Sequence, residues 1–323
     1  MAASRNKPSA DLPARVGRFL ATHLTGSEAI FVGLSGGCDS VVLLHLLSQQ
    51  GGSHSLSAVH VHHGLSRNAD QWELFCRDYC ARLKIPLLIQ RVDVELDQGD
   101  GLESAARRAR YGVFSEVTAD CIALAQHRGD QAETVLFNLL RGAGVVGAAA
   151  LPSVRRFADK QLIRPLLDVS RAEIEAYALS NQLEWIEDES NQDISLSRNY
   201  LRHQILPKLA ERFPSAESAL AQAAENFSEA AFLLDELAEQ DWCFVRDGET
   251  AQPKLLRQLS LPRLKNVLRY RWRQLGWRMP SATRLDEFVR QLKTAGPDRH
   301  PELVLSEGRL QIIKGRLHWL PEK

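Results

Sequence analysis

The chain has 323 residues, of which 44% are hydrophobic and 25% are charged, so it is long enough for two or three domains with full cores. No run approaches the roughly 18 apolar residues of a membrane span, residues 1–12 contain no apolar signal segment, and the five scattered cysteines include no CxxC pair. These features argue against a membrane protein, a secreted protein and a disulfide scaffold, and we expect a cytoplasmic protein.

Charge is unevenly distributed along the chain. Basic and acidic residues number 40 each, yet residues 251–323 hold 16 Lys and Arg against 6 Asp and Glu. Residues 1–250 therefore carry an equal surplus of negative charge. A basic C-terminal part is typical of a segment that meets a polyanion, although an ordinary solvated surface would have the same composition.

Strand and helix patterns alternate four times in the first 140 residues. Short connections between them indicate a parallel sheet with helices on both faces. Ligands of such sheets bind beyond the carboxyl ends of the strands, where the segments 35–40, 60–63 and 126–133 should meet. The expected strands are 29–34, 56–62, 87–92 and 121–125, and the expected helices are 12–24, 41–47, 69–83, 102–117 and 130–140.

The rest of the chain predicts a smaller α+β domain. We therefore divide the chain into an N-terminal domain over 1–213, a linker helix over 214–242 and a basic C-terminal domain over 243–323. The helix after Ser170 has a capping box with Glu173. The expected elements are a strand at 162–167, helices at 170–180, 215–241, 261–275 and 281–294, and strands at about 302–306, 309–313 and 316–320.

The clearest motif is the stretch 34–40, LSGGCDS, between the first strand and the next helix. Two glycines let the backbone turn sharply and approach a ligand closely. The free N–H groups at the helix start favour an anion, and the serine hydroxyls add donors. The sequence therefore predicts a phosphate cradle, although it is neither GxxxxGK[ST] nor GxGxxG. The alternative is a plain turn rich in small residues.

Two pairs of charged residues have both a chemical and a structural interpretation. Asp130 and Glu133 lie three residues apart at a helix start, so their carboxylates share a face and could bind an ammonium group or Mg²⁺, or simply stabilise the helix end. Arg107 and Arg110 share a helix face and could bind phosphates at the reacting centre, or form surface ion pairs.

The histidines His60, His62 and His63 follow the second strand. They could line a nucleotide pocket, pack within the strand, or bind zinc, but no fourth zinc ligand has convincing spacing.

These stretches resemble the PP-loop ATP pyrophosphatases and, among them, closely resemble the tRNA(Ile)-lysidine synthase family. The resemblance extends from residue 28 over nearly the whole chain, with weaker motifs in the C-terminal part. It implies a Rossmann-like (adenine nucleotide alpha hydrolase-like) N-terminal domain and a tRNA-contacting second domain. The segments that carry it are 34–40 (LSGGCDS), 60–66 (HVHHGLS), 103–111 (ESAARRARY), 129–144 (GDQAETVLFNLLRGAG), 164–167 (RPLL) and 188–202 (DESNQDISLSRNYLR).

The resemblance implies a two-step ligation. The C2 oxygen of the wobble cytidine in a CAU-anticodon tRNA(Ile) is adenylated by ATP, and free L-lysine then displaces AMP. ATP would be a substrate, Mg²⁺ would accompany it, and tRNA(Ile) and L-lysine would be the partners. The sequence leaves the oligomeric state open, a homodimer included.

The resemblance also assigns roles to individual residues. Asp130 and Glu133 would receive lysine, Arg107 and Arg110 would act at the reacting phosphate, and Asp39 would help to place Mg²⁺ and take part in catalysis. The ATP site would comprise Leu34, Ser35, Gly36, Gly37, Cys38, Asp39 and Ser40, with His60 and His62 beside it. The residues assigned to tRNA are Arg198, Arg202, Lys265, Arg269 and Arg273.

Two departures from the family pattern stand out. Gln126 occupies a position where the family often has histidine, and a glutamine cannot take a proton. Many members carry a further C-terminal module, whereas this sequence ends at Lys323.

Three other functions stay open at this point. One is a sulfur-transferring PP-loop tRNA enzyme, for which Cys76 and Cys80 are the only near cysteine pair. The others are a non-catalytic nucleotide-binding module and a small-molecule amidotransferase or synthetase, which would have no obvious use for the basic C-terminal part.

Overall fold

The computed structural model describes residues 12–322 apart from 27, 53, 96–100, 295 and 297–300, and only the backbone of Ser190 and Asn191. The chain divides into two compact units, Met1–Ser228 (unit 1) and Glu229–Lys323 (unit 2). No helix of the described residues is long and apolar enough to cross a membrane.

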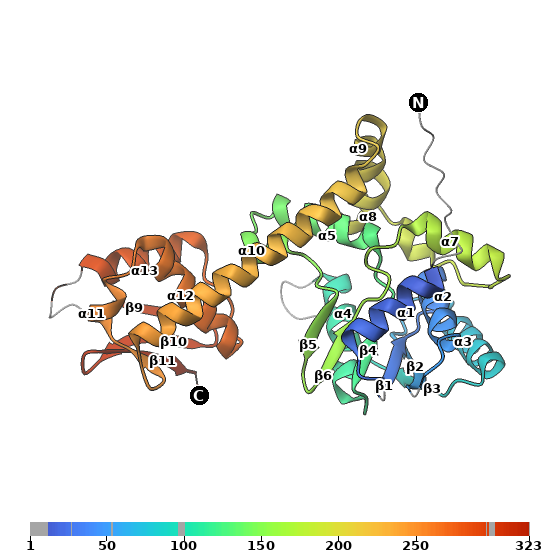
Figure 1. The fold of residues 1–323 in the computed structure, drawn as a ribbon, viewed down its shortest axis with the longest axis horizontal. Coiled ribbons are helices and arrows are strands. Elements are labelled where there is room, and N and C mark those ends of the chain that lie inside the picture. The colour runs from blue at the N-terminus through green and yellow to red at the C-terminus, as the bar shows by residue number, and fades with distance from the viewer. Residues whose placement is uncertain are drawn as a thin grey trace. The chain divides into compact units, whose positions relative to one another are not determined.

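Unit 1 contains a six-stranded sheet with the strand order β3-β2-β1-β4-β6-β5 (Figure 1). All neighbouring strands pair in parallel except β5 and β6, which form an antiparallel hairpin at one edge. The predicted α/β fold with a largely parallel sheet is confirmed. The strands are β1 (Ala29–Gly33), β2 (Ser55–His62), β3 (Leu87–Arg91), β4 (Cys121–Ala123), β5 (Val154–Phe157) and β6 (Lys160–Ile163).

Helices cover both faces of this sheet. The larger core packs α1, α2, α3 and α7 against one face, and a smaller core centred on Phe114 packs α4 against the other. Helix α2 is apolar on nearly all sides, as expected for a helix that is buried between the sheet and α7. The helices are α1 (Leu12–His23), α2 (Cys38–Ser48), α3 (Ala69–Leu83), α4 (Leu102–Glu116), α5 (Arg128–Leu140), α6 (Val145–Ala148) and α7 (Arg171–Ser180).

The strand expected at 162–167 is wrong in its bounds. Strand β6 begins at Lys160 and ends at Ile163, because Pro165 has no N–H with which to continue the ladder. Its partner β5 was not expected, since two arginines interrupt the apolar pattern of this short edge strand.

An irregular helical segment follows α7. After a 3-10 turn, η1 (Glu189–Gln192), the chain is helical through α8 (Ser197–Tyr200), the π turn η2 (Leu201–Ile205) and α9 (Leu206–Arg212). In the π turn the N–H of Leu206 bonds the carbonyl of Leu201, five residues earlier. Pro207 accounts for this irregularity, because a proline inside a helix cannot donate and its ring collides with the carbonyl four residues before it.

Helix α10 (Ala216–Val245) is 30 residues long and contains the boundary between the two units. A long helix was expected at 215–241. The division of the chain into domains at residues 213 and 242 stays a prediction.

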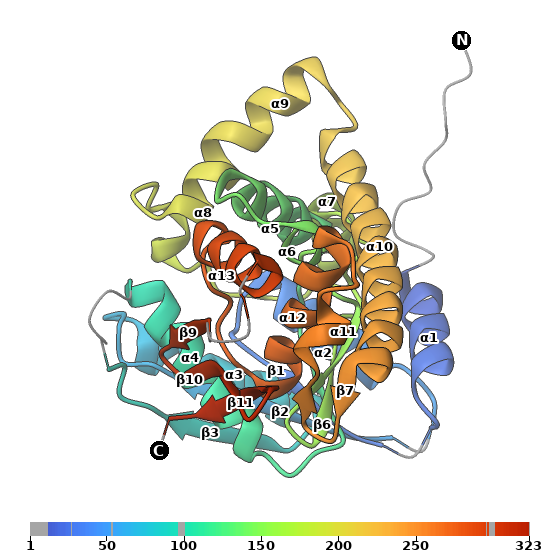
Figure 2. The ribbon, with the colours of Figure 1, turned by 90° about the vertical axis from the view of Figure 1, so that its left-hand side faces the viewer.

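Unit 2 contains an antiparallel sheet with the order β7-β8-β11-β10-β9, and β9, β10 and β11 lie side by side in Figure 2. Lys314 and Gly315 both have positive φ in the two-residue turn between β10 and β11, as a type I′ hairpin requires. Trp272, Phe288 and Leu310 lie in its core. The elements are β7 (Arg246–Asp247), β8 (Thr250–Ala251), α11 (Pro253–Leu256), α12 (Leu261–Leu275), α13 (Ala282–Thr294), β9 (Glu302–Leu305), β10 (Gly308–Ile313) and β11 (Arg316–Pro321).

Candidate active site

The glycine-rich loop closes on itself between β1 and α2. The Ser40 hydroxyl donates to the Gly37 carbonyl at 2.9 Å and lies 3.1 Å from the Ser35 hydroxyl. Gly36 has φ 90°, and a Cβ there would lie 2.8 Å from Ile186 Cδ1, so this position needs glycine. Gly37, the N-cap of α2, has no side-chain cap, so N–H groups at the helix start stay available for an anion.

Asp39 lies in the first turn of α2 and uses only one of its carboxylate oxygens. Oδ2 accepts from Arg171 Nη1 at 2.6 Å, whereas Oδ1 is buried and has no hydrogen-bond partner in the described part of the chain. Burial raises the pKa of Asp39. Mg²⁺ prefers carboxylate oxygens, and this one is buried and unpartnered next to the predicted phosphate-binding loop, so Asp39 fits the predicted metal role.

The acid pair begins helix α5. His127 caps this helix, accepting from Gly129 N at 3.0 Å through Nδ1 while its own N–H donates to Asp130 Oδ2 at 2.9 Å. The other Asp130 oxygen and both oxygens of Glu133 accept from Arg202 at 2.5–3.0 Å. Glu133 is 2% exposed, and burial raises its pKa in spite of Arg202.

The loop and the acid pair belong to one site. Strands β1 and β4 are parallel neighbours, so the segments that follow them emerge at the same edge of the sheet. The charges of His127, Asp130 and Arg202 all act on the carboxyl group of Asp39. The structure thus brings Asp39, Asp130 and Glu133 together from two elements that are about 90 residues apart in the chain.

Arg107 and Arg110 lie on α4 among other positive groups. The Arg107 guanidinium donates to the Tyr111 hydroxyl at 3.2 Å and stacks over its ring. Burial, followed by the charge of Arg107, lowers the pKa of Arg110. Burial and then Arg110 lower the pKa of His63 to about 4. Among the described residues, no carboxylate lies within ion-pair distance of the Arg110 guanidinium, and a cation among other cationic groups creates a place for an anion.

His60 stabilises the glycine-rich loop through a hydrogen bond to its backbone. Its side chain is buried, and Nδ1 donates to the Leu34 carbonyl at 2.9 Å, at the point where β1 leads into the glycine turn. This bond holds the loop by its backbone, and the predicted direct contact of His60 with ATP stays a prediction.

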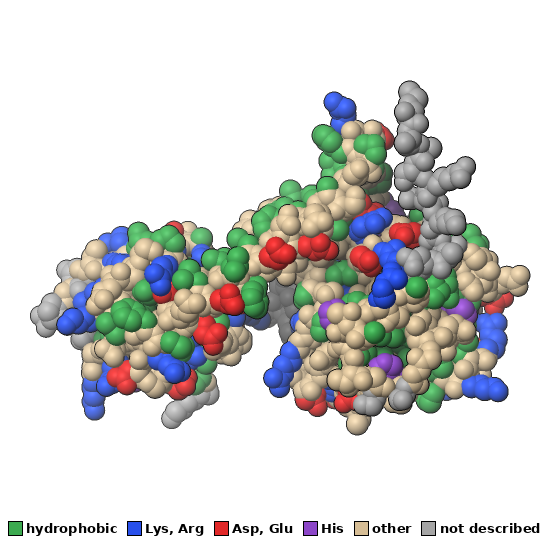
Figure 3. All heavy atoms as spheres, viewed as in Figure 1, with side chains coloured by type: hydrophobic (Ala, Val, Ile, Leu, Met, Phe, Trp, Pro, Cys, Tyr) green, Lys and Arg blue, Asp and Glu red, His purple; other side chains and the backbone are tan. Residues whose placement is uncertain are grey.

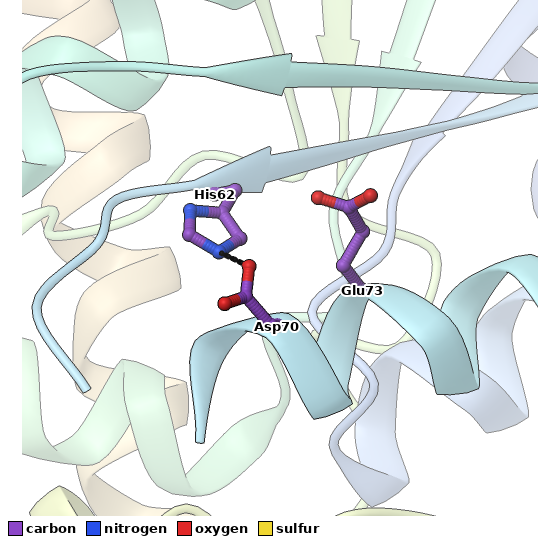
Figure 4. Close-up of side chains that lie close together, drawn as sticks. All are labelled: His62, Asp70 and Glu73. Carbon is purple, nitrogen blue, oxygen red and sulfur yellow. Dashed lines mark hydrogen bonds and ion pairs between the residues drawn. The ribbon is translucent and has the colours of Figure 1, made fainter. Parts of the chain in front are cut away.

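His62 points to a different set of charges, drawn in Figure 4. Its Nε2 lies 3.2 Å from Asp70 Oδ1, and possible ligand atoms of His62, Asp70 and Glu73 all lie within 4.8 Å of one another. Both acids already accept from Arg91, at 2.8 and 2.9 Å, and Glu73 also accepts from Arg77. Two guanidinium groups balance the two carboxylates, so the group is an ion-pair network that leaves no charge for a metal ion.

The residues predicted to contact tRNA differ in how they are paired. Arg198 lies 3.5 Å from Glu103, Lys265 lies 2.5 Å from Asp286, and Arg273 pairs with Asp235. Among the described residues, no hydrogen bond or ion pair links Arg269 to a partner, and its side chain is exposed. On the face of unit 2 drawn in Figure 3, basic and acidic side chains alternate.

Sequence reasoning assigned no role to two arginines of this region. Arg171 bonds Asp39 from the first turn of α7, and its only sequence signal was its position after the Ser170 cap. Arg164 is 1% exposed and donates to Gln126 Oε1 and, at 2.6 Å, to the Pro152 carbonyl. Gln126 is thus a neutral acceptor for a buried cation, which accounts chemically for a glutamine at this position.

A separate cavity of about 370 Å³ lies on the opposite face of α5. Arg128 and Gln131 of α5, Phe19 of α1 and Glu225 of α10 are among the residues that line it. It contains none of the predicted site residues, so it is not the site described above.

Comparison with known proteins decides the family. The profile of a PP-loop domain matches residues 9–209, and the profile of a TilS substrate binding domain matches residues 254–318. A tRNA(Ile)-lysidine synthase of Pseudomonas fluorescens is 44% identical, over 97% of this chain and 73% of its own length. The tRNA(Ile)-lysidine synthase of Nitrosomonas europaea is 42% identical, over 94% of this chain and 67% of its own length. That of Coxiella burnetii is 39% identical, over 95% of this chain and 69% of its own length.

The chain belongs to the tRNA(Ile)-lysidine synthase family. The family resemblance of its motifs is thereby confirmed. As a member of this family, the chain is a PP-loop enzyme that uses ATP and modifies tRNA.

A solved structure adds support for the fold alone. The U34-tRNA thiolase NcsA from Methanococcus maripaludis, solved with its 4Fe-4S cluster, matches with a TM-score of 0.59 at 19% identity, over 68% of this chain and 78% of that one. In the present chain, burial raises the pKa of Cys76 to about 12 and that of Cys80 to about 11. These buried thiols stay protonated at neutral pH, which disfavours the sulfur-transfer alternative.

Proposed function

We propose that this enzyme joins free L-lysine to C2 of the wobble cytidine of tRNA(Ile) with a CAU anticodon. The cytidine C2 oxygen attacks the α-phosphorus of ATP, and the bond to the pyrophosphate oxygen breaks. An amino group of lysine then attacks C2, loses a proton, and AMP leaves with the C2 oxygen. ATP, lysine and tRNA are available together in the cytoplasm, where we place the reaction.

The observation that carries this proposal is the pairing of a phosphate cradle with a cation-binding acid pair at one edge of the sheet. Asp130 and Glu133 already bind one cationic side chain, that of Arg202, at 2.5–3.0 Å. We assign the substrate ammonium group to this pair. Because burial raises the pKa of Glu133, its carboxylate is also a better proton acceptor than an exposed glutamate when the amine attacks.

We assign the ATP phosphates to the loop Leu34–Ser40. The N–H groups at the start of α2 and the Ser35 and Ser40 hydroxyls would bind the pyrophosphate part. Asp39 Oδ1 would hold Mg²⁺, which supplies charge neutralisation for the departing pyrophosphate. Arg107 and Arg110 would stabilise the negative charge that develops at the α-phosphate.

We also propose that tRNA contacts Arg198 in unit 1 and the basic side chains Lys265, Arg269 and Arg273 in unit 2. Their support is the surplus of positive charge after residue 250 and the exposure of Arg269. Arg202 is engaged by the acid pair, so we assign it a different role below.

A single assay tests the proposed reaction. ATP labelled in its α-phosphate is incubated with the enzyme, and L-lysine and purified tRNAs are added one at a time. We expect label on CAU-anticodon tRNA(Ile) without lysine, and release of that label as AMP once lysine is added. AMP release that is independent of tRNA, or that does not respond to lysine, would contradict the proposal.

A further inference from the structure

Arg202 caps the acid pair that we propose as the lysine subsite. Its Nε donates to Glu133 Oε1 at 2.5 Å, and its Nη2 donates to Glu133 Oε2 at 3.0 Å and to Asp130 Oδ1 at 2.9 Å. The Glu133 side chain is 3% exposed, and that of Arg202 is 36% exposed. One guanidinium thus covers the buried Glu133 and the partly buried Asp130 while part of its own side chain still reaches solvent.

The position of Arg202 depends on an irregular turn. The residue lies in η2, the π turn that interrupts the helix between α8 and α9. π turns are frequent at functional sites, because the extra residue changes the direction in which side chains leave the helix.

Arg202 and lysine compete for the same atoms. A guanidinium and an ammonium group are both cations that donate hydrogen bonds to carboxylates, and Arg202 already uses three of the four oxygens of the pair. The fourth, Asp130 Oδ2, accepts from the His127 backbone. Each of the four oxygens thus already has a donor, and the guanidinium covers the buried Glu133. A lysine amino group can therefore take the place beside Glu133 only when Arg202 moves.

We propose that Arg202 is a placeholder for the substrate. It binds Asp130 and Glu133 in the unliganded enzyme and is displaced when the amino group of lysine binds. This inference rests on the proposed lysine subsite, and it makes Arg202 a positioning residue for that subsite.

A placeholder solves a physical problem of this subsite. A buried carboxylate without a cation is strongly disfavoured, so an empty subsite would tend to take up a proton or rearrange. Arg202 keeps the pair charged and ordered, and lysine binding becomes an exchange of one cation for another. The apparent affinity for lysine is then the intrinsic affinity multiplied by the fraction of molecules in which Arg202 has moved away.

Removing the guanidinium tests this exchange. Arg202→Met keeps a long unbranched side chain without the charge, and we expect the KM for lysine to fall about tenfold while the KM for ATP is unchanged. Arg202→Lys retains the positive charge but loses the bidentate hydrogen bonds. Its KM for lysine should lie between those of the wild type and Arg202→Met. Arg212→Met removes an exposed arginine from the end of α9 and serves as the matched control. An unchanged or higher KM for lysine in Arg202→Met overturns the proposal.

If a variant loses turnover, equilibrium dialysis with labelled lysine measures its affinity for lysine directly. Guanidinium ion, at a millimolar concentration well below that which unfolds the protein, should compete with lysine in Arg202→Met more strongly than in the wild type. Equal competition in both proteins overturns the placeholder.

Glu133→Gln separates this proposal from the proposed function. If Glu133→Gln leaves lysine binding unchanged, the subsite itself is wrongly assigned. If Glu133→Gln weakens lysine binding but Arg202→Met does not strengthen it, the subsite is correct and Arg202 is only a structural ion pair.

Discussion

Charged side chains are used differently at the sheet edge of unit 1 and on the surface of unit 2. At the sheet edge, Glu133 is buried, and so is one oxygen of Asp39, which has no hydrogen-bond partner among the described residues. On unit 2, Lys265 and Arg273 pair with acids on the surface. Buried charge is costly unless it has a function or a partner, whereas surface pairs contribute little. The contrast teaches that burial identifies the reactive centre better than composition does.

The largest effect should come from the unpartnered carboxylate. Asp39→Ala removes the proposed magnesium ligand, and we expect ATP–pyrophosphate exchange to fall by two to three orders of magnitude, roughly the effect of losing one preorganised electrostatic group. Thermal unfolding of the variant serves as the control that it is folded. Exchange within a few-fold of the wild type would remove Asp39 from the reaction.

Glu133 should control lysine and leave ATP unaffected. Glu133→Gln removes one charged acceptor, so the KM for lysine should rise about 10- to 100-fold. Burial raises the pKa of Glu133, so the wild-type carboxylate becomes protonated at a higher pH than an exposed glutamate. Protonation removes the charge that binds lysine, and the KM for lysine should therefore rise as the pH falls. A pH profile that is the same in Glu133→Gln would contradict this assignment.

His60 should matter for the stability of the loop. His60→Ala leaves the Leu34 carbonyl without its buried partner, and we expect a loss of about 1–3 kcal/mol in the free energy of unfolding. Urea denaturation measures it. His62→Ala is the comparison on the same strand, because its partner Asp70 is exposed and keeps Arg91. If both variants lose the same free energy of unfolding, the hydrogen bond to the Leu34 carbonyl does not stabilise the loop specifically.

The smallest effect should appear in unit 2. Arg269→Ala should weaken tRNA binding a few-fold and reduce the slope of log affinity against log salt by about one, as expected for one phosphate contact. Lys265→Ala should do less, because Asp286 already balances that charge. Filter binding over a range of salt concentrations compares the two. If Lys265→Ala has the larger effect, the contrast between paired and unpaired charge on unit 2 fails.

The sequence was sufficient where one local pattern determines the structure. The loop between β1 and α2, the capping box of α7 and the helix α12 could all be predicted, because strand pattern, glycine and helix caps are short-range signals. The short edge strand β5 could not be predicted, since its two arginines hide the strand pattern.

Other parts of the site depend on contacts between distant residues. The bond between Arg164 and Gln126 joins residues 38 positions apart, and that between Arg171 and Asp39 joins residues 132 positions apart. The bond of Arg202 to Glu133 from the π turn was not predicted either, and the predicted contact of Arg202 with tRNA stays a prediction. Pro207 was the available signal, because a proline after several helical residues predicts an irregular turn before it.

The most direct test of the account is a crystal structure with L-lysine and a non-hydrolysable ATP analogue bound. We predict the phosphates of the analogue against the Ser35–Ser40 loop, and a lysine nitrogen within about 3.2 Å of Glu133 in the place that Arg202 occupies here. Lysine bound away from Asp130 and Glu133, or lysine bound there beside an unmoved Arg202, would contradict the account.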